Sequence, residues 1–257
     1  MTVKNIFFNS LLEGLRYWFC FIKNHLALTV GLYLTITGLA LFAHYSSNQF
    51  FGLSVFSLLF PLFIQCLCLF TLGFSCLFVL PYFFQKMLNK EDEFIYIPST
   101  FHKFLFENFR PWIKEMSKVL AVSYLWGLLL IVPGLVKLIK CSFVNYIVLF
   151  NKSYRIQEVS ALKHSSKLTK GFTLWFLLLV ATYMGLSYPV GYLTQDIQTE
   201  VFSWKTVGAI ALEYLWTVLA SFFISITYHL IYLKRDQELY EPSESYEEPP
   251  AVVSAVL

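Results

Sequence analysis

The chain has few charged residues, and between residues 45 and 85 it has no Lys, Arg, Asp, Glu or His at all. Charged residues make up 14% of the 257 residues, whereas 57% are hydrophobic and 19% are aromatic. The mean hydropathy is +0.62. A water-soluble domain of this length carries more charge and does not need so much apolar side chain. The composition therefore argues against a soluble protein and predicts a membrane protein.

The sequence also lacks the motifs that mark common enzymes. It contains no GxxxxGK[ST], GxGxxG or GxSxG pattern, and its histidines form no HExxH pair. The longest predicted loop, residues 85–117, is too short for an ordinary extramembrane catalytic domain. We therefore expect no catalytic residues, no cofactor and no metal site. An unusual intramembrane enzyme is a weaker alternative.

Cysteine is scarce and shows no metal-binding pattern. Cys66 and Cys68 are separated by one residue, which is not the spacing of metal ligands. We interpret the cysteines as small packing residues in contact with lipid or neighbouring helices. They are Cys20, Cys66, Cys68, Cys76 and Cys141.

Long hydrophobic runs fill most of the chain. A helix needs about 20 apolar residues to cross the hydrocarbon core of a bilayer. The runs predict an all-α, polytopic membrane protein with six transmembrane helices and short amphipathic helices at the membrane surface. The second run is long for one span, and we expect Pro61 and Pro81 to kink it or mark its ends. The predicted spans are residues 26–43, 51–84, 118–134, 136–151, 172–190 and 206–232.

The basic residues predict which side of the membrane each loop faces. Lys and Arg are enriched in the short cytoplasmic loops of membrane proteins. With six spans and both termini cytoplasmic, every Lys and Arg except Lys137, Lys140 and Lys205 falls in a cytoplasmic segment. Dividing residues 51–84 into two spans would place the basic residues of 163–170 outside. We therefore reject a seven-span topology.

The predicted organisation has three parts. Residues 1–25 carry apolar residues at near-helical spacing, which favours an amphipathic interfacial helix; an ordinary charged lead-in to the first span is an equal alternative. Residues 26–235 form the six-helix transmembrane domain. Residues 236–257 contain acidic residues and prolines but no basic residue, which predicts a disordered acidic cytoplasmic tail. Solubility is the simplest role of this tail, and binding of a protein partner is the alternative.

Three prolines suggest helix boundaries. A cytoplasmic surface helix is expected over residues 98–117, beginning at Pro98 and broken at Pro111 before the third span. Pro133 and Gly134 are expected to break the chain at a tight turn between the third and fourth spans. This turn would lie on the outer side of the membrane.

A basic strip follows the predicted fourth span. A short helix is expected from Val159 to Gly171, and its lysines lie within about 60° of one another on a helical wheel. Anionic lipid attracts each basic residue at the cytoplasmic leaflet by roughly 1 kcal/mol. The strip is either a docking site for anionic headgroups or a set of charges that only fixes topology and solvates a loop. It consists of Lys152, Arg155, Lys163, Lys167 and Lys170.

Glu213 lies inside the last predicted span, about 12 Å below its outer end at 1.5 Å per residue. A carboxylate in hydrocarbon costs several kcal/mol unless it is paired, protonated or hydrated. Lys137, Lys140 and Lys205 are candidate partners. Glu213 with Lys137 or Lys140 is therefore a candidate polar site for a headgroup, an ion or a proton. A structural salt bridge or simple snorkelling is the alternative.

The segment from the third to the fifth span resembles a known family. An apolar run ending in Pro133-Gly134 leads to another span and then to ALKHSSKLTKG at residues 161–171. This order resembles the bacterial six-span family related to the membrane domain of glycerophosphoryl diester phosphodiesterases, whose corresponding segment is close to EALKRSWKLTKG. His164 and Ser166 depart from that pattern. The resemblance implies a helical protein of the bacterial inner membrane, but no phosphodiesterase activity, because a separate soluble domain carries that chemistry.

Two functions remain open at this point. The leading expectation is a non-enzymatic integral membrane protein with a lipid-associated or scaffold role in the envelope. The alternative is a small transporter or permease with a polar site around Glu213 and Lys137 or Lys140. A water-accessible cavity at Glu213 would favour the transporter, and a dry, closed bundle with a basic cytoplasmic rim would favour the first. Expected partners are membrane lipids, including anionic headgroups, and no nucleic acid; the oligomeric state is not predicted.

Overall fold

The computed structural model describes residues 2–49, 55–88, 98–129, 131–151, 154, 160–198 and 203–240. These residues form helices and contain no strand, which confirms the predicted all-α class. The helices are α1 Val3–Asn24, α2 Leu26–Gln49, α3 Val55–Phe74, the π-helix η1 Ser75–Val79, α4 Leu80–Leu88, α5 Pro98–Leu129, α6 Ile131–Lys140, α7 Val144–Phe150, α9 Ala161–Leu168, α10 Thr173–Gln198 and α11 Trp204–Tyr240.

Five segments of the described chain are long and apolar enough to cross a membrane. The protein therefore has the character of a multi-pass membrane protein. The third predicted span, residues 118–134, is not among the five. Its apolar residues continue directly from the charged part of α5, which contains Lys114, Glu115 and Lys118. The five segments are Leu26–Ser46, Leu59–Leu88, Val132–Phe150, Thr173–Tyr192 and Trp204–Leu239.

Pro111 does not end a helix, contrary to the prediction. It lies inside the continuous helix α5. Packing on the residue after it accounts for this, because Trp112 is buried and its indole N–H donates to Asn145 Oδ1 of α7 at 2.6 Å. This tertiary contact offsets the hydrogen bond that a proline removes from a helix.

Pro133 and Gly134 also lie inside a helix, in the first turn of α6, which begins at Ile131. Gly134 has a different role from the one expected. A Cβ at this position would lie 2.7 Å from the Cα of Gly127 in α5. The glycine is therefore needed for the close packing of two neighbouring helices.

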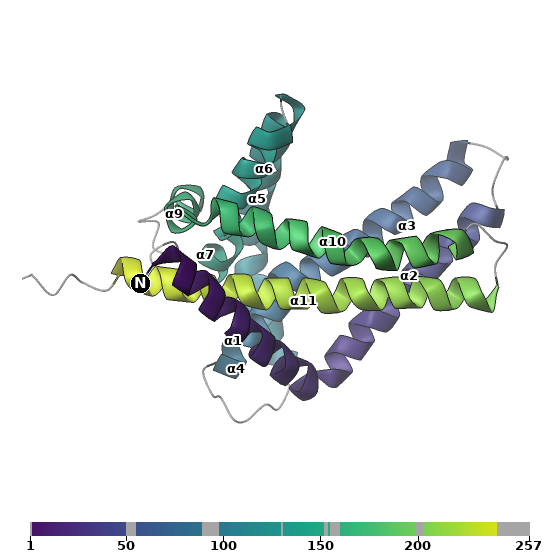
Figure 1. Ribbon diagram of the computed structural model, residues 1–257, viewed down its shortest axis with the longest axis horizontal. Coiled ribbons are helices and arrows are strands. Elements are labelled where there is room, and N and C mark those ends of the chain that lie inside the picture. The colour runs from purple at the N-terminus through teal and green to yellow at the C-terminus, as the bar shows by residue number, and fades with distance from the viewer. Residues whose placement is uncertain are drawn as a thin grey trace, which may run out of the picture.

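Helical hairpins organise the molecule. The pairs α2 with α3, α5 with α6, and α10 with α11 pack along each other. In Figure 1 the tips of these hairpins point apart, whereas α7, α9 and the C-terminal end of α11 lie closer together. The described fold is therefore more tightly packed at one end than at the other.

The N-terminal helix predicted within residues 1–25 is present as α1; its position at the membrane surface stays a prediction. It crosses α11 obliquely (Figure 1). Gly14 permits this crossing, since a Cβ there would lie 2.6 Å from Thr227 Oγ1. A salt bridge of 2.7 Å between Glu13 and Lys234 also joins the two helices.

The C-terminal helix extends further than expected. Helix α11 continues to Tyr240, so residues 236–240 are helical and do not belong to a disordered tail. Contacts of Asp236 with other helices account for this extension, as described below. The remainder of the expected acidic tail, residues 241–257, lies outside the described residues.

Candidate functional site

A polar pocket of about 270 Å³ lies beside Glu213, between α2, α3 and α11. Its residues recur at helical spacing, so each helix presents one face to it. The hollow exists because α2 contributes two alanines, whose short side chains leave the space unfilled. The lining residues are Ala40, Ala43, His44, Gln65, Cys68, Ile210, Glu213 and Tyr214.

The pocket holds one acidic side chain among several other hydrogen-bonding groups. Glu213 is half-buried, and Gln65 on α3 is exposed. An imidazole, an amide and a phenol can each donate or accept hydrogen bonds, and His44, Gln65 and Tyr214 supply them. No Lys or Arg occurs among the described residues that line the pocket. The site is therefore suited to a cation that also needs hydrogen-bond acceptors.

The candidate partners Lys137 and Lys140 do not line this pocket. Both belong to α6, on a different hairpin. The Lys137 ammonium lies 5.1 Å from the centre of the Trp126 ring on α5, which is a cation–π contact. The carbonyl of Lys140 accepts a hydrogen bond from Ser165 Oγ. The structure thus groups Glu213 with neutral polar residues of α2 and α3 and not with these lysines.

Two lysines of the predicted basic strip, Lys163 and Lys167, lie on α9, and Lys170 lies in the turn that follows it. Lys163, Lys167 and Lys170 are exposed, while Ala161 and Leu168 on the opposite side are fully buried. Gly171, at φ 88°, follows the helix and permits the turn into α10. The remaining members of the strip, Lys152 and Arg155, lie outside the described residues.

The buried side of α9 belongs to a polar cluster that we call the junction, formed by α7, α9 and the last turns of α11. Asp236 Oδ1 lies 3.0 Å from His164 Nε2. Asn151 Nδ2 and the Tyr232 hydroxyl both donate to Asp236 Oδ2, at 3.5 and 3.4 Å. One carboxylate therefore connects all three helices.

A serine in the junction forms hydrogen bonds with the backbone between α6 and α7. Ser165 is fully buried; its hydroxyl donates to the carbonyl of Lys140 at 2.8 Å and accepts from the backbone N–H of Phe143 at 3.2 Å. These are groups that a helix end leaves without a partner. Ser165, which the family resemblance includes, thus has a structural role.

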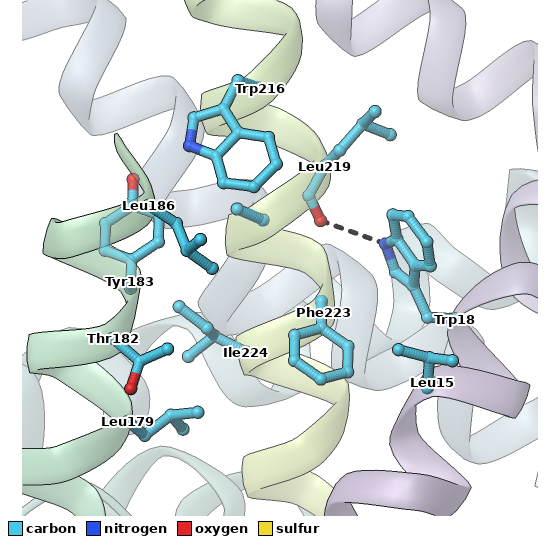
Figure 2. Close-up of a pocket in the computed structure, with 11 residues that line it drawn as sticks. Leu15, Trp18, Leu179, Thr182, Tyr183, Leu186, Trp216, Leu219, Phe223 and Ile224 are labelled. Atoms are coloured by element: carbon cyan, nitrogen blue, oxygen red, sulfur yellow. Dashed lines mark hydrogen bonds between the residues drawn. The ribbon is translucent and has the colours of Figure 1, made fainter. Parts of the chain in front are cut away.

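An apolar groove of about 220 Å³ lies on the other side of α11, between α1 and α10 (Figure 2). Its walls carry aliphatic and aromatic side chains. Figure 2 shows Leu15 and Trp18 on one wall and Leu179 and Leu186 on the opposite wall, with α11 between them. Sequence analysis did not identify this groove, because its residues come from three distant segments.

The Glu213 pocket contains residues that sequence analysis also missed. Gln65 could have been identified as a candidate from the sequence, because it is an amide inside an otherwise apolar run. His44 was harder to identify from the sequence, because it stands at the end of a predicted span, where polar residues are common. Within the residues that the structure describes, no group of three or more His, Cys, Asp or Glu is arranged to hold a metal ion.

No known protein family, curated protein or solved structure matches this chain. The resemblance to the six-span family remains an expectation from the sequence.

Proposed function

We propose that this protein is a permease-type membrane protein that binds a small organic cation in the Glu213 pocket. The observation that carries the proposal is a polar pocket of about 270 Å³ between three apolar helices, with a carboxylate in its wall. Polar cavities of this kind in transmembrane segments mark pathways for ions and substrates. The alternative from the sequence is thus favoured over the leading expectation, with a different set of partners for Glu213.

The size of the pocket supports a solute of this class. A water molecule takes up about 30 Å³ in the liquid. The pocket therefore has room for several waters or for a small alkylammonium ion. Either occupant would place hydrogen-bonding groups beside the carboxylate.

The charge of the pocket supports a cation over an anion. Two unit charges at 4 Å interact by about 4 kcal/mol at the effective dielectric of a protein surface. Glu213 would attract a cation and repel an anion by amounts of this order. The amide of Gln65 and the phenol of Tyr214 offer further acceptors for an ammonium N–H.

Thiol labelling tests whether water reaches the pocket and whether the pocket selects charge. Gln65 is replaced by Cys in a chain whose five native cysteines are replaced by Ser. A trimethylammonium methanethiosulfonate reagent should label Q65C roughly tenfold faster than the sulfonate reagent, a difference of about 1.4 kcal/mol. Adding E213Q should make the two rates equal. Tetramethylammonium, but not equimolar acetate, should slow the labelling.

The native Cys66 provides a matched control. It neighbours Gln65 in sequence and is exposed, but it does not line the pocket. A chain that retains Cys66 alone should react slowly with both reagents, because charged reagents do not enter hydrocarbon. Failure of Q65C to react, or equal rates for the two reagents while Glu213 is present, would contradict the proposal.

We also propose the finer topology, with six spans in a bacterial inner membrane and both termini in the cytoplasm. The tip of the α5–α6 hairpin supports a sixth span, because Leu120, Leu125 and Leu128 expose more than half of their surface. These side chains suit a lipid environment. A C-terminal epitope tag should resist protease in intact cells and be cleaved in inverted vesicles. Cleavage in intact cells would contradict this topology.

A lipid-associated role is the second candidate function. The apolar groove of Figure 2 is the specific observation in its favour. The two roles are compatible, because the groove and the pocket lie against different faces of α11.

A further inference from the structure

The groove between α1, α10 and α11 offers almost no free polar group to an occupant. The indole N–H of Trp18 donates to the carbonyl of Leu219 at 3.0 Å, and that of Trp216 donates to Ser187 Oγ at 2.9 Å. The hydroxyl of Thr182 donates to the carbonyl of Leu178 at 2.8 Å. These donors are directed to protein acceptors, so recognition in the groove depends on shape and apolar contact.

The surroundings of the groove indicate what covers it. Its α10 and α11 walls lie within two of the segments that are apolar enough to cross a membrane. Its margins are apolar as well, with Leu178, Leu186 and Leu12 exposed by 53%, 56% and 71%. This continuous apolar surface would face hydrocarbon. An empty groove there would lose the dispersion contacts of its walls.

We propose that the groove is a specific site for one acyl chain of a membrane phospholipid. The chain would enter between Leu15 on α1 and Leu186 on α10, and pack on Phe223 and the two indoles. Because Leu15 and Trp18 belong to α1, a bound chain would also pack against α1 beside α11. This inference does not depend on the proposed function of the Glu213 pocket.

A substitution that fills the groove tests the site. Ala220 lines the groove, and A220L places a larger side chain in it. The control is A181L, on an exposed position of α10 that does not line the groove. Each chain is reconstituted in vesicles of phosphatidylethanolamine and phosphatidylglycerol, extracted in detergent, washed and analysed for retained lipid by mass spectrometry.

The wild-type chain and A181L should each retain phospholipid, and A220L should retain at least several-fold less. Equal retention in A220L and wild type would overturn the proposal. So would retention of free fatty acid in place of phospholipid, because the occupant would then be a different molecule.

Tryptophan fluorescence gives a second measurement that does not require A220L to fold. In vesicles of phospholipid with brominated chains, the signal of a contacted tryptophan is quenched. Quenching of Trp216, measured against W216F, should persist after dilution into unbrominated vesicles. Quenching of Trp126, an exposed residue outside the groove, should reverse quickly. Equally fast reversal at both positions would show only general lipid contact and overturn the specific site.

Discussion

The junction and the Glu213 pocket both place a carboxylate in an otherwise apolar protein, but the two carboxylates have different surroundings. In the junction, Asp236 accepts hydrogen bonds from Asn151 and Tyr232 and pairs with His164. In the pocket, Glu213 borders a polar cavity. The first carboxylate therefore joins helices, whereas the second lies in the wall of a cavity.

Side-chain size explains why one region is closed and the other is hollow. The core beside the junction is filled by aromatic rings, with Phe143 and Phe172 fully buried and Tyr146 at 2% exposure. At the pocket, the neighbouring side chains on α2 are the much smaller Ala40 and Ala43. A polar group in a membrane protein needs a partner in either case. Large neighbours bring protein groups together, and small ones leave room for another molecule.

The largest effect is expected on breaking the junction. D236A removes the acceptor of several hydrogen bonds and should lower the free energy of unfolding by about 1.5–3 kcal/mol, the range for bonds to a charged group. The apparent thermal midpoint in detergent would report this. The control is E238A on the same helix, whose carboxylate pairs with Arg235 three residues earlier in α11, and a pair of this kind within one helix contributes a few tenths of a kcal/mol. Similar midpoints for both variants would contradict a structural junction.

A comparable but smaller loss of stability is expected when the hydrogen bonds between α6 and α7 are removed. S165A leaves the N–H of Phe143 without its partner, and such a buried group costs about 1–3 kcal/mol. The neighbouring S166A should be almost neutral, because Ser166 is exposed. Thermal unfolding of the two variants side by side distinguishes a local hydrogen-bond loss from a general effect of serine removal.

Removing the pocket carboxylate should affect stability little. E213Q keeps the size of the side chain, and we expect a change of less than about 1 kcal/mol, the range for a solvated charge. The same variant should abolish the charge-selective labelling of Q65C. A loss of stability as large as that of D236A would mean that Glu213 is a structural residue like Asp236.

The smallest expected effect is on the pH dependence of stability, and it comes from a residue outside both the junction and the pocket. Burial lowers the pKa of His25, at the turn between α1 and α2, below its ordinary value of 6.5. The folded protein therefore holds this imidazole neutral, and stability is full above about pH 6.5. It falls as the pH drops from 6.5 towards the lowered pKa, because the unfolded chain takes up a proton first. Thermal midpoints at pH 7.5 and 5.5 should differ less in H25F than in wild type.

Particular residues show how far the sequence alone could predict this protein. The uncharged run from residue 45 to 85 predicted a membrane-spanning segment, and Leu59–Leu88 is long and apolar enough to be one. The short helix before Gly171 was also predicted, with its lysines on one face. Pro111 and Pro133 misled the prediction, because local rules for proline ignore the packing of Trp112 and the close approach of Gly134 to Gly127.

By itself, the sequence determined that this chain is helical and suited to a membrane, since composition and apolar run length depend only on local chemistry. It also identified Glu213 as a carboxylate in an unfavourable position. Only the tertiary structure decided the neighbours of that carboxylate. His44 and Gln65 come to the pocket from other helices, and Lys137 does not line it. Such contacts depend on how helices pack, and no spacing along the chain specifies them.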